Sequence, residues 1–421
     1  MSSHAPIAST GVEPVVLPRS EHAVSRKQIT ENTLKVLYRL ARHGHKAYLV
    51  GGGVRDLLLG RQPKDFDVGT DATPEQIRKL FRNAFLVGRR FRLAHIRFAG
   101  NELIEVATFR REATLDDQPD EGVDEAHFCE NLFGTPEQDA FRRDFTINAL
   151  FYDIETFEII DYVGGLEDLR LRRLRVIGDP LIRFAEDPVR MLRALEFAAR
   201  LQFNLDSPIR EAIQSRAPLL MEAAPARVRE EIMELVRHKV VGEVLSNAQG
   251  MGLLSYLVPG YQLSATTLQL LDQLDRRTAS GVPPKEYELL AMLYLEKFLR
   301  ACPPADERLT IANAVQLGGK LLTPHCAYFH IAQGIRHQAR ELLIGCFRLA
   351  RGPQRKGQLR FLRNPAFKPA LELFRFWCEA SGAGLDIIEA WQQKSVSPAG
   401  GSDAAPKRTR KRRRRRPRKT E

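Results

Sequence analysis

Two aspartates placed two positions apart are the residues of this sequence best suited to chemistry. Asp65 and Asp67 lie in KDFDV (64–68), where polar and apolar residues alternate as in a half-buried strand. Because alternate side chains of a strand share a face, both carboxylates are expected to point the same way. Such close like charges repel unless a cation joins them, and carboxylate oxygens suit Mg²⁺. Pairs of this kind also occur on solvated strands, so the two aspartates need further support.

A third carboxylate provides part of that support. Glu105 is the lone acid within the strand-like run 103–109. On a strand next to the aspartates, it would complete a two-metal cluster that stabilises both the attacking and the leaving oxygen of a transfer reaction. The alternative is that Glu105 is a solvated residue on the surface of a strand.

Three consecutive glycines form the second chemical feature. Gly51, Gly52 and Gly53 follow the apolar run 47–50 and open a helix pattern, with Arg55 in its first turn. A turn of this kind exposes backbone N–H groups and lets a phosphate approach closely. The Walker and dinucleotide-binding glycine patterns both fail here, so without the nearby aspartates the glycines would indicate only a structural turn.

The elements that must position these residues follow from periodicity and capping signals. We expect helices after Thr30 and after the capping sequence 73–76, and strands over 47–50, 65–68, 95–98 and 103–109. Together they predict a small mixed α/β domain. Beyond about residue 161 strand signals fade and long amphipathic helix patterns, such as 187–201 and 225–236, indicate a helical second half.

Positive charge is concentrated near the end of the sequence. The net charge is +12, and the residues from 407 onward carry +10 of it. A block of like charges repels itself and has nothing to bury, so we expect a disordered tail over 395–421 that binds a polyanion. The basic residues expected to make this contact are Lys407, Arg408, Arg410, Lys411, Arg412, Arg413, Arg414, Arg415 and Arg416.

Composition excludes several other classes of protein. At 421 residues, with 43% apolar and 28% charged residues, the sequence is typical of a soluble protein of two or more domains. It has no apolar run long enough for a membrane span and no secretory signal pattern, so we expect a cytoplasmic protein. Five scattered cysteines without a paired spacing argue against disulfides and against a cysteine zinc site.

Five ordered motifs resemble those of the class II tRNA nucleotidyltransferase and bacterial poly(A) polymerase family. They are GGGVRDLLLG (51–60), KDFDV (64–68), RRDFTINAL (142–150), DYVGGLEDL (161–169) and EDPVRMLRALEFAA (186–199). The resemblance implies a flexible lead over 1–25, a polymerase-beta-like α/β catalytic head over 26–160, and an all-helical neck for nucleotide recognition over 161–240. A helical RNA-binding body over 241–394 and the basic tail, here an RNA-binding segment, would complete the chain.

The same resemblance implies roles for individual residues. Asp65, Asp67 and Glu105 would hold two Mg²⁺ ions, and Gly52, Gly53 and Arg55 would meet the triphosphate of ATP. Three residues of the RRDFTINAL motif would lie near the sugar and phosphates, namely Arg143, Asp144 and Asn148. Asp187 and Arg190, expected i, i+3 on one helix face, would read the incoming base, with Arg193 in the same nucleotide-binding set. The alternative for Asp187, Arg190 and Arg193 is a surface ion-pair network.

The arginine-rich stretch LVGRRFRLAHIRF (86–98) resembles the poly(A) polymerases more than their CCA-adding relatives. Arg89, Arg90 and Arg92 would hold phosphates of ATP or RNA, unless they form only a basic strand edge. Residues 129–131 and the LVP sequence at 257–259 depart from the family pattern in a loop and in the neck.

The prediction is therefore template-independent transfer of AMP from ATP to RNA 3′ ends, with release of pyrophosphate. We expect a monomer whose partners are ATP, the 3′ ends of mRNA and other single-stranded RNA, and RNA-decay proteins, in a reaction that promotes RNA turnover. A CCA-adding tRNA nucleotidyltransferase is the alternative within the family. A catalytically inactive RNA-binding protein is the alternative from another class.

Overall fold

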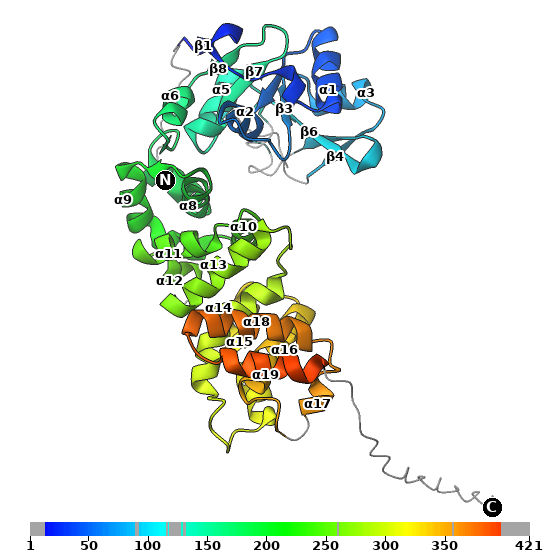
Figure 1. Ribbon diagram of the computed structural model, residues 1–421. Helices are drawn as coiled ribbons and strands as arrows, with labels where there is room; N and C mark the ends of the chain where they lie inside the picture. Colours follow the sequence, from blue (N-terminus) through cyan, green and yellow to red (C-terminus); the bar gives the residue numbers. More distant parts are fainter. Residues whose placement is uncertain are drawn as a thin grey trace, which may run out of the picture.

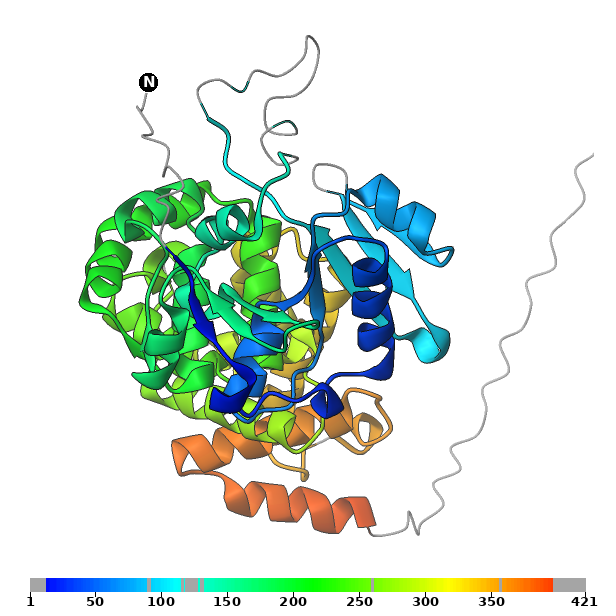
Figure 2. The same ribbon diagram turned by 90° about the horizontal axis from the view of Figure 1, so that it is seen from above.

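The computed structural model shows an elongated molecule with an α/β head at one end and a column of helices below it (Figure 1). Seen from above, the head lies over the helical part (Figure 2). The described residues are 13–88, 92–114, 117, 128, 132–258, 261–355 and 358–396. Arg89, Arg90, the segment 129–131 and residues 397–421 therefore lie outside the described part.

An eight-stranded sheet in the order β1-β8-β7-β2-β3-β6-β5-β4 forms the head. The pairing of β3 with β6 is parallel, and the other pairings in the sheet are antiparallel. The strands are β1 (Val15–Leu17), β2 (Ala47–Val50), β3 (Asp67–Thr70), β4 (Ala84–Val87), β5 (Leu93–Arg97), β6 (Leu103–Thr108), β7 (Leu150–Asp153) and β8 (Ile159–Asp161).

Alternation along the strands divides the sheet into two faces. In β6, Ile104 and Val106 are buried in the main hydrophobic core, whereas Glu105 between them is partly exposed. Helices α1 (Glu31–Arg42) and α3 (Pro74–Leu80) contribute Leu37 and Ile77 to the same core, and each begins at a threonine N-cap. The opposite face therefore carries the polar side chains.

A second, smaller core covers only part of that opposite face. Val50 of β2 and Phe151 of β7 pack there with Phe109 and with Ala140 of helix α5 (Pro136–Arg142). Val50 is the cross-strand neighbour of Asp67, so the apolar cover ends where the acidic residues begin. This boundary leaves the β3–β6 region accessible.

Below the head, helices dominate. The neck contains α6 (Gly165–Arg170), α7 (Pro180–Glu186), α8 (Arg190–Leu201), α9 (Ser207–Arg216) and α10 (Pro225–Arg237). The body contains α11 (Val241–Gly250), α12 (Leu254–Leu257), α13 (Ala265–Ala279), α14 (Glu286–Ala301), α15 (Ile311–Tyr328), α16 (Gln333–Ala350), α17 (Gln358–Phe361), α18 (Phe367–Ser381) and α19 (Leu385–Val396). Among the helices that the structure describes, none is long and apolar enough to cross a membrane.

The predicted fold class, an α/β head followed by helical domains, is confirmed, but several boundaries are wrong. The lead over 1–25 is not flexible throughout, because β1 pairs with β8 at the sheet edge. The neck is not all helical, since β9 (Arg173–Leu174) and β10 (Asn204–Leu205) form a parallel pair. Residues 395 and 396, expected to belong to the disordered tail, instead form the end of α19, which extends to Val396.

Candidate active site

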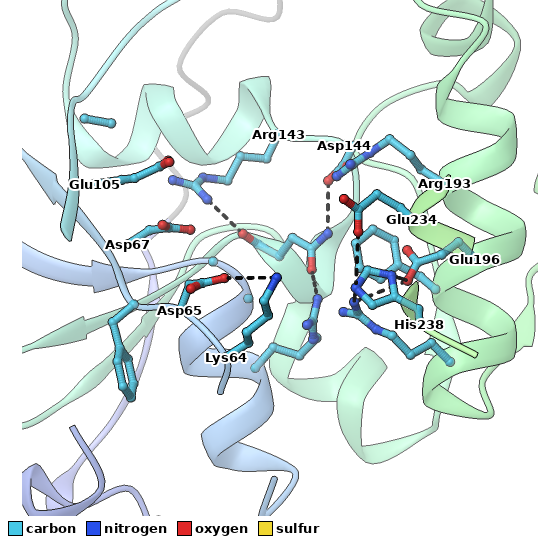
Figure 3. A pocket seen from close by; sticks show the side chains of 18 of the residues that line it. Lys64, Asp65, Asp67, Glu105, Arg143, Asp144, Arg193, Glu196, Glu234 and His238 are labelled. Carbon is cyan, nitrogen blue, oxygen red and sulfur yellow. Dashed lines mark hydrogen bonds and ion pairs between the residues drawn. The ribbon is translucent and has the colours of Figure 1, made fainter. Parts of the chain in front are cut away.

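A cleft of about 1240 Å³ separates the polar face of the head from helices α8 and α10 of the neck. Figure 3 shows Asp65, Asp67 and Glu105 on the head side, and Arg193, Glu196, Glu234 and His238 on the neck side. The cleft thus brings together residues from four of the five sequence motifs and from α10.

The three acidic residues predicted to cooperate lie on neighbouring segments of the sheet. Asp67 begins β3 and pairs in register with Glu105 of β6, which confirms that the third carboxylate lies on an adjacent strand. Asp65 comes just before β3, not within a strand as predicted. On one side of Asp65, β2 ends at Val50, opposite Asp67, and Gly51 turns away with φ 70°, so β2 offers Asp65 no partner.

Although Asp65 lies outside the strand, buried neighbours still fix the direction in which the two aspartate side chains point. Phe66 and Val68 are buried in the main core, while Asp65 and Asp67 on either side of Phe66 are exposed to the cleft. The alternation predicted from sequence is therefore kept even though the strand is shorter. One residue of slip would bury both carboxylates, so the apolar anchors select this register.

Electrostatics in the cleft favour a cation beside these carboxylates. Limited solvation within the cleft, together with the charges of Glu105 and Asp65, raises the pKa of Asp67 to about 6, although Arg143 opposes the shift. The Lys64 ammonium lies 3.9 Å from Asp65 Oδ2, with both side chains largely exposed, so it screens Asp65 only weakly.

The donor set fits a hard divalent cation in chemistry, since all three groups offer carboxylate oxygens. In the described part of the chain, no three His, Cys, Asp or Glu side chains are drawn together closely enough to enclose a metal ion. The three carboxylates thus supply suitable donors in an open arrangement.

Of the three glycines in the turn after β2, two line the cleft and one packs against the aspartate segment. Gly51 and Gly52 line the cleft, and a Cβ on Gly51 would approach the Arg143 guanidinium to 3.0 Å. Gly53, predicted to meet a triphosphate, is instead buried beneath the aspartate segment, where a Cβ would lie 3.4 Å from the Phe66 ring. Its absence of a side chain lets α2 (Gly52–Leu58) pack closely against Asp65 and Phe66, just before β3.

Arg55 lines the cleft but is almost fully buried, so it is not a free phosphate ligand. Its guanidinium donates to Asn148 Oδ1 at 2.6 Å and to Asp56 Oδ1 at 2.8 Å. Burial lowers the pKa of Arg55, and Asp56 offsets part of this shift. The residue predicted to meet the triphosphate therefore also holds Asn148 in place.

A chain of hydrogen bonds joins this part of the head to the neck. Asn148 Nδ2 donates to Asp144 Oδ1 at 3.2 Å, and Arg193 of α8 donates to Asp144 Oδ2 through Nε at 2.9 Å and through a terminal nitrogen at 2.7 Å. Burial alone would raise the pKa of Asp144, but the charge of Arg193 and these hydrogen bonds hold it below its usual value. The Asp144–Arg193 pair is a direct ionic link between the two walls of the cleft.

The base-reading pair predicted on one helix face is arranged differently. Asp187 lies between α7 and α8 and is not on a helix with Arg190. Its carboxylate pairs with Arg227 of α10 at 2.8 Å, and it is not among the residues lining the cleft. Arg190 does line the cleft, where it is held by Glu186 at 3.0 Å.

Sequence reasoning missed the acidic and aromatic part of the neck wall. Glu196 lies 2.9 Å from His238 Nδ1 and 3.2 Å from Arg200. The Phe197 ring is approached by the guanidinium carbons of Arg55, Arg193 and Arg200 at 5.2, 5.4 and 5.1 Å. Helical spacing was the available signal, because positions 193, 196, 197 and 200 fall on one face of α8.

The DYVGGLEDL motif proves to be structural. Gly164 has φ 84° and caps α6, and a Cβ on Gly165 would lie 2.3 Å from the Thr146 carbonyl oxygen. Asp161 accepts four backbone N–H groups at the start of α6, and the fully buried Asp168 accepts hydrogen bonds from Arg173 and Arg175. Through Gly165 this motif packs against Thr146 of the RRDFTINAL segment.

The cleft combines the carboxylates of a mixed sheet with arginines of the head and the neck, and comparison with known proteins identifies the class as nucleotidyltransferase. Residues 47–175 match the Poly A polymerase head domain, and residues 202–263 match the domain described as "Probable RNA and SrmB- binding site of polymerase A". Poly(A) polymerase I of Salmonella typhimurium is 38% identical over 429 residues, covering 95% of this chain and 92% of that protein. The chain belongs to the poly(A) polymerase and tRNA nucleotidyltransferase family.

Two further relatives each match about half of the chain. Poly(A) polymerase I of Escherichia coli O157:H7 is 55% identical over 226 residues, 53% of this chain and 48% of that protein. The CCA-adding enzyme of Bacillus licheniformis is 40% identical over 228 residues, 54% of this chain and 55% of that protein. The crystal structure of a tRNA nucleotidyltransferase with a primer tRNA and an incoming ATP analogue has a TM-score of 0.58 at 25% identity, covering 85% of this chain and 98% of that one. The resemblance seen in the motifs is thus confirmed.

Proposed function

We propose that this nucleotidyltransferase polyadenylates RNA, transferring AMP from ATP to the RNA 3′-hydroxyl without a template and releasing pyrophosphate. The observation that carries the proposal is the extent of similarity to Poly(A) polymerase I of Salmonella typhimurium, which spans 95% of this chain and includes the body. The CCA-adding relative described above matches about half of the chain. Activity on RNA 3′ ends in the cytoplasm, by a monomer that promotes RNA turnover with RNA-decay proteins, belongs to the same proposal.

Asp65, Asp67 and Glu105 are the proposed metal-holding residues. Two bound Mg²⁺ ions would lower the pKa of the attacking hydroxyl and neutralise the departing pyrophosphate. The chain's own contribution is to hold the carboxylates on one face of the sheet, through the register of β3 with β6 and the buried anchors beside Asp67. Asp65 and Asp67 would serve both ions and Glu105 one of them.

The nucleotide would lie across the link between head and neck. Arg143 projects into the cleft beside Gly51 and is braced by Asp139 at 2.9 Å, which suits a guanidinium that receives phosphate. Asn148, fixed by Arg55 and Asp144, can donate to a ribose hydroxyl and so select a ribonucleotide. We propose that Arg190 and Asp187 read the base, for which the Asp187–Arg227 pair has to open.

Further basic groups of the chain would hold the RNA. The proposed RNA contacts are the tail residues from 407 onward, and Arg89 and Arg90 are proposed to contact phosphates. Arg92 is partly committed to Glu75, at 3.1 Å between two exposed side chains, so its phosphate contact would compete with a weak ion pair.

The second candidate is CCA addition to tRNA. The similarity of about half of the chain to the CCA-adding enzyme of Bacillus licheniformis, and the fold shared with the tRNA nucleotidyltransferase, favour it specifically. The two functions share the transfer chemistry and differ in nucleotide choice and acceptor RNA. Nucleotide choice is therefore the discriminating measurement.

The test supplies Mg²⁺ and each labelled nucleoside triphosphate separately, with a generic single-stranded RNA and with a tRNA that lacks CCA. The matched control is the Asp65→Ala, Asp67→Ala double variant. Long tails from ATP on the generic RNA, absent in the control, would support polyadenylation. Incorporation of C and A on the tRNA alone would instead establish the second candidate.

A further inference from the structure

One row of side chains crosses four adjacent strands of the head at the position of the carboxylates. Phe85 of β4 is paired with His95 of β5, His95 with Glu105 of β6, and Glu105 with Asp67 of β3. Directly paired residues of neighbouring strands project to the same face of a sheet. The imidazole of His95 therefore stands beside the carboxylate of Glu105, on the side away from Asp67.

The two side chains of this pair are unequally exposed. His95 Nε2 lies 3.4 Å from Glu105 Oε1, and the His95 side chain is 18% exposed against 46% for Glu105. The imidazole also meets the Phe85 ring edge to face, with centroids 5.6 Å apart. Arg97 of β5 covers Phe85 in turn, with its guanidinium carbon 5.3 Å from the ring centroid. His95 is thus held by packing, whereas Glu105 is free to meet a ligand.

A glutamate in this position needs an external restraint. Its side chain has several rotatable bonds, and the negative charges of Asp67 and Asp65 favour rotation away from them. Hydrogen bonds from outer groups commonly orient the carboxylates that bind a metal. In the tautomer with hydrogen on Nε2, His95 can donate such a bond to Oε1 after a small shift from the present separation.

We infer that His95 is a positioning residue that restrains one oxygen of Glu105, so that the other oxygen is directed to the cation shared with Asp65 and Asp67. This inference rests on the proposed function of the three carboxylates. His95 itself does not contact the cation or the substrates. Its loss should therefore weaken cation binding without weakening the binding of RNA.

Three variants separate positioning from packing. His95→Phe keeps a ring against Phe85 but removes the donor, and His95→Gln restores an N–H group at a similar reach along the side chain. Phe85→Leu is the matched control, since it changes the packing of His95 but leaves its imidazole in place. Melting temperatures of all three variants report whether any of them disturbs the fold.

The primary readout is Mn²⁺ binding to the full-length protein with a non-hydrolysable ATP analogue, measured from the free Mn²⁺ signal in electron paramagnetic resonance. We expect a Kd about tenfold higher for His95→Phe, at the lower end of the loss typical of outer-sphere partners. His95→Gln should recover most of this loss, and Phe85→Leu should match the wild type. The Mg²⁺ concentration for half-maximal transfer should follow the same order, with RNA affinity unchanged.

Two outcomes would overturn the inference. One is a Mn²⁺ affinity in His95→Phe equal to that of the wild type. The other is an equal loss in all three variants accompanied by lower melting temperatures, which would assign His95 to packing alone. Failure of the proposed function would look different, because the wild type itself would then incorporate no nucleotide at any Mg²⁺ concentration.

Discussion

The two walls of the cleft carry charge in opposite ways. On the head wall, Asp65, Asp67 and Glu105 are close to one another, and limited solvation together with their like charges raises the pKa of Asp67. On the neck wall and at its junction with the head, acids lie beside guanidinium groups, as in Asp144 with Arg193 and Glu196 with Arg200. The carboxylates of the head wall thus lie beside like charges, whereas acids of the neck wall and its junction lie beside guanidinium groups.

This difference suggests a division of labour. A group whose charge is already paired keeps its geometry before a substrate arrives, which is the requirement for recognising a nucleotide. A group whose charge is unpaired gains most from a cation and binds it most strongly. Variants of the two walls should accordingly change different measured quantities.

The largest effect is expected from the head wall. Asp67→Asn should lower the rate of AMP transfer at saturating Mg²⁺ by more than about a hundredfold, beyond what the loss of an outer-sphere partner costs. Its melting temperature without a divalent cation should not fall, because the substitution removes a repelling charge. Single-turnover transfer assays and calorimetry check both points. A transfer rate within a few-fold of the wild type would contradict the role of Asp67.

A smaller effect is expected at the link between the walls. Asp144→Asn leaves Arg193 without its carboxylate and should cost about 1–2 kcal/mol of stability, less than a fully buried pair because Arg193 is 37% exposed. The KM for ATP should rise while the Mn²⁺ affinity stays close to that of the wild type. Equal damage to Mn²⁺ affinity would show that the two walls are not separable.

The difference in stability between the wild type and Asp144→Asn should depend on pH. Pairing holds the pKa of Asp144 below its usual value of 3.8, so its stabilising contribution is present above that pH and is lost as the pH falls through the lower, folded-state pKa. The difference in melting temperature between wild type and Asp144→Asn should therefore be constant from neutral pH to about pH 4 and shrink below it. A difference that already disappears near pH 6 would contradict this assignment.

The smallest effect on the transfer reaction is expected from the basic segment 407–421. Deleting residues 407–421 should weaken RNA binding at moderate salt and flatten its salt dependence, because each neutralised phosphate of a single strand adds roughly −0.7 to the log–log slope. ATP affinity should be unaffected. RNA titrations at several salt concentrations test this, and an unchanged RNA affinity would remove the tail from the account.

Much of the head was predictable because burial constrains it. The alternation around Asp67 indicated which face the aspartates occupy, and the capping residues at positions 30 and 73 indicated where α1 and α3 begin. The pairing of β1 with β8 was not predictable, since a three-residue strand has no internal pattern and its partner is distant in sequence. The row of paired residues Asp67, Glu105 and His95 was not predictable either, because it depends on the register between neighbouring strands.

The error at Asp187 has a local cause that the sequence contained. Apolar spacing continued across residues 187–201 and suggested one helix. Pro188, however, disfavours helical backbone at the residue before it, and Asp187 has φ −143°. The proline thus marked the break between α7 and α8. The burial of Arg55 could not be predicted in the same way, because it depends on Asn148, which is distant in sequence.

The most direct test of polyadenylation is competition among nucleotides. The wild-type protein would be given all four nucleoside triphosphates, Mg²⁺, a generic single-stranded RNA and a tRNA lacking CCA in one reaction, and the added 3′ sequences would be read. The account predicts extended runs of A on the generic RNA. Extension confined to the tRNA and ending after C, C and A would contradict it.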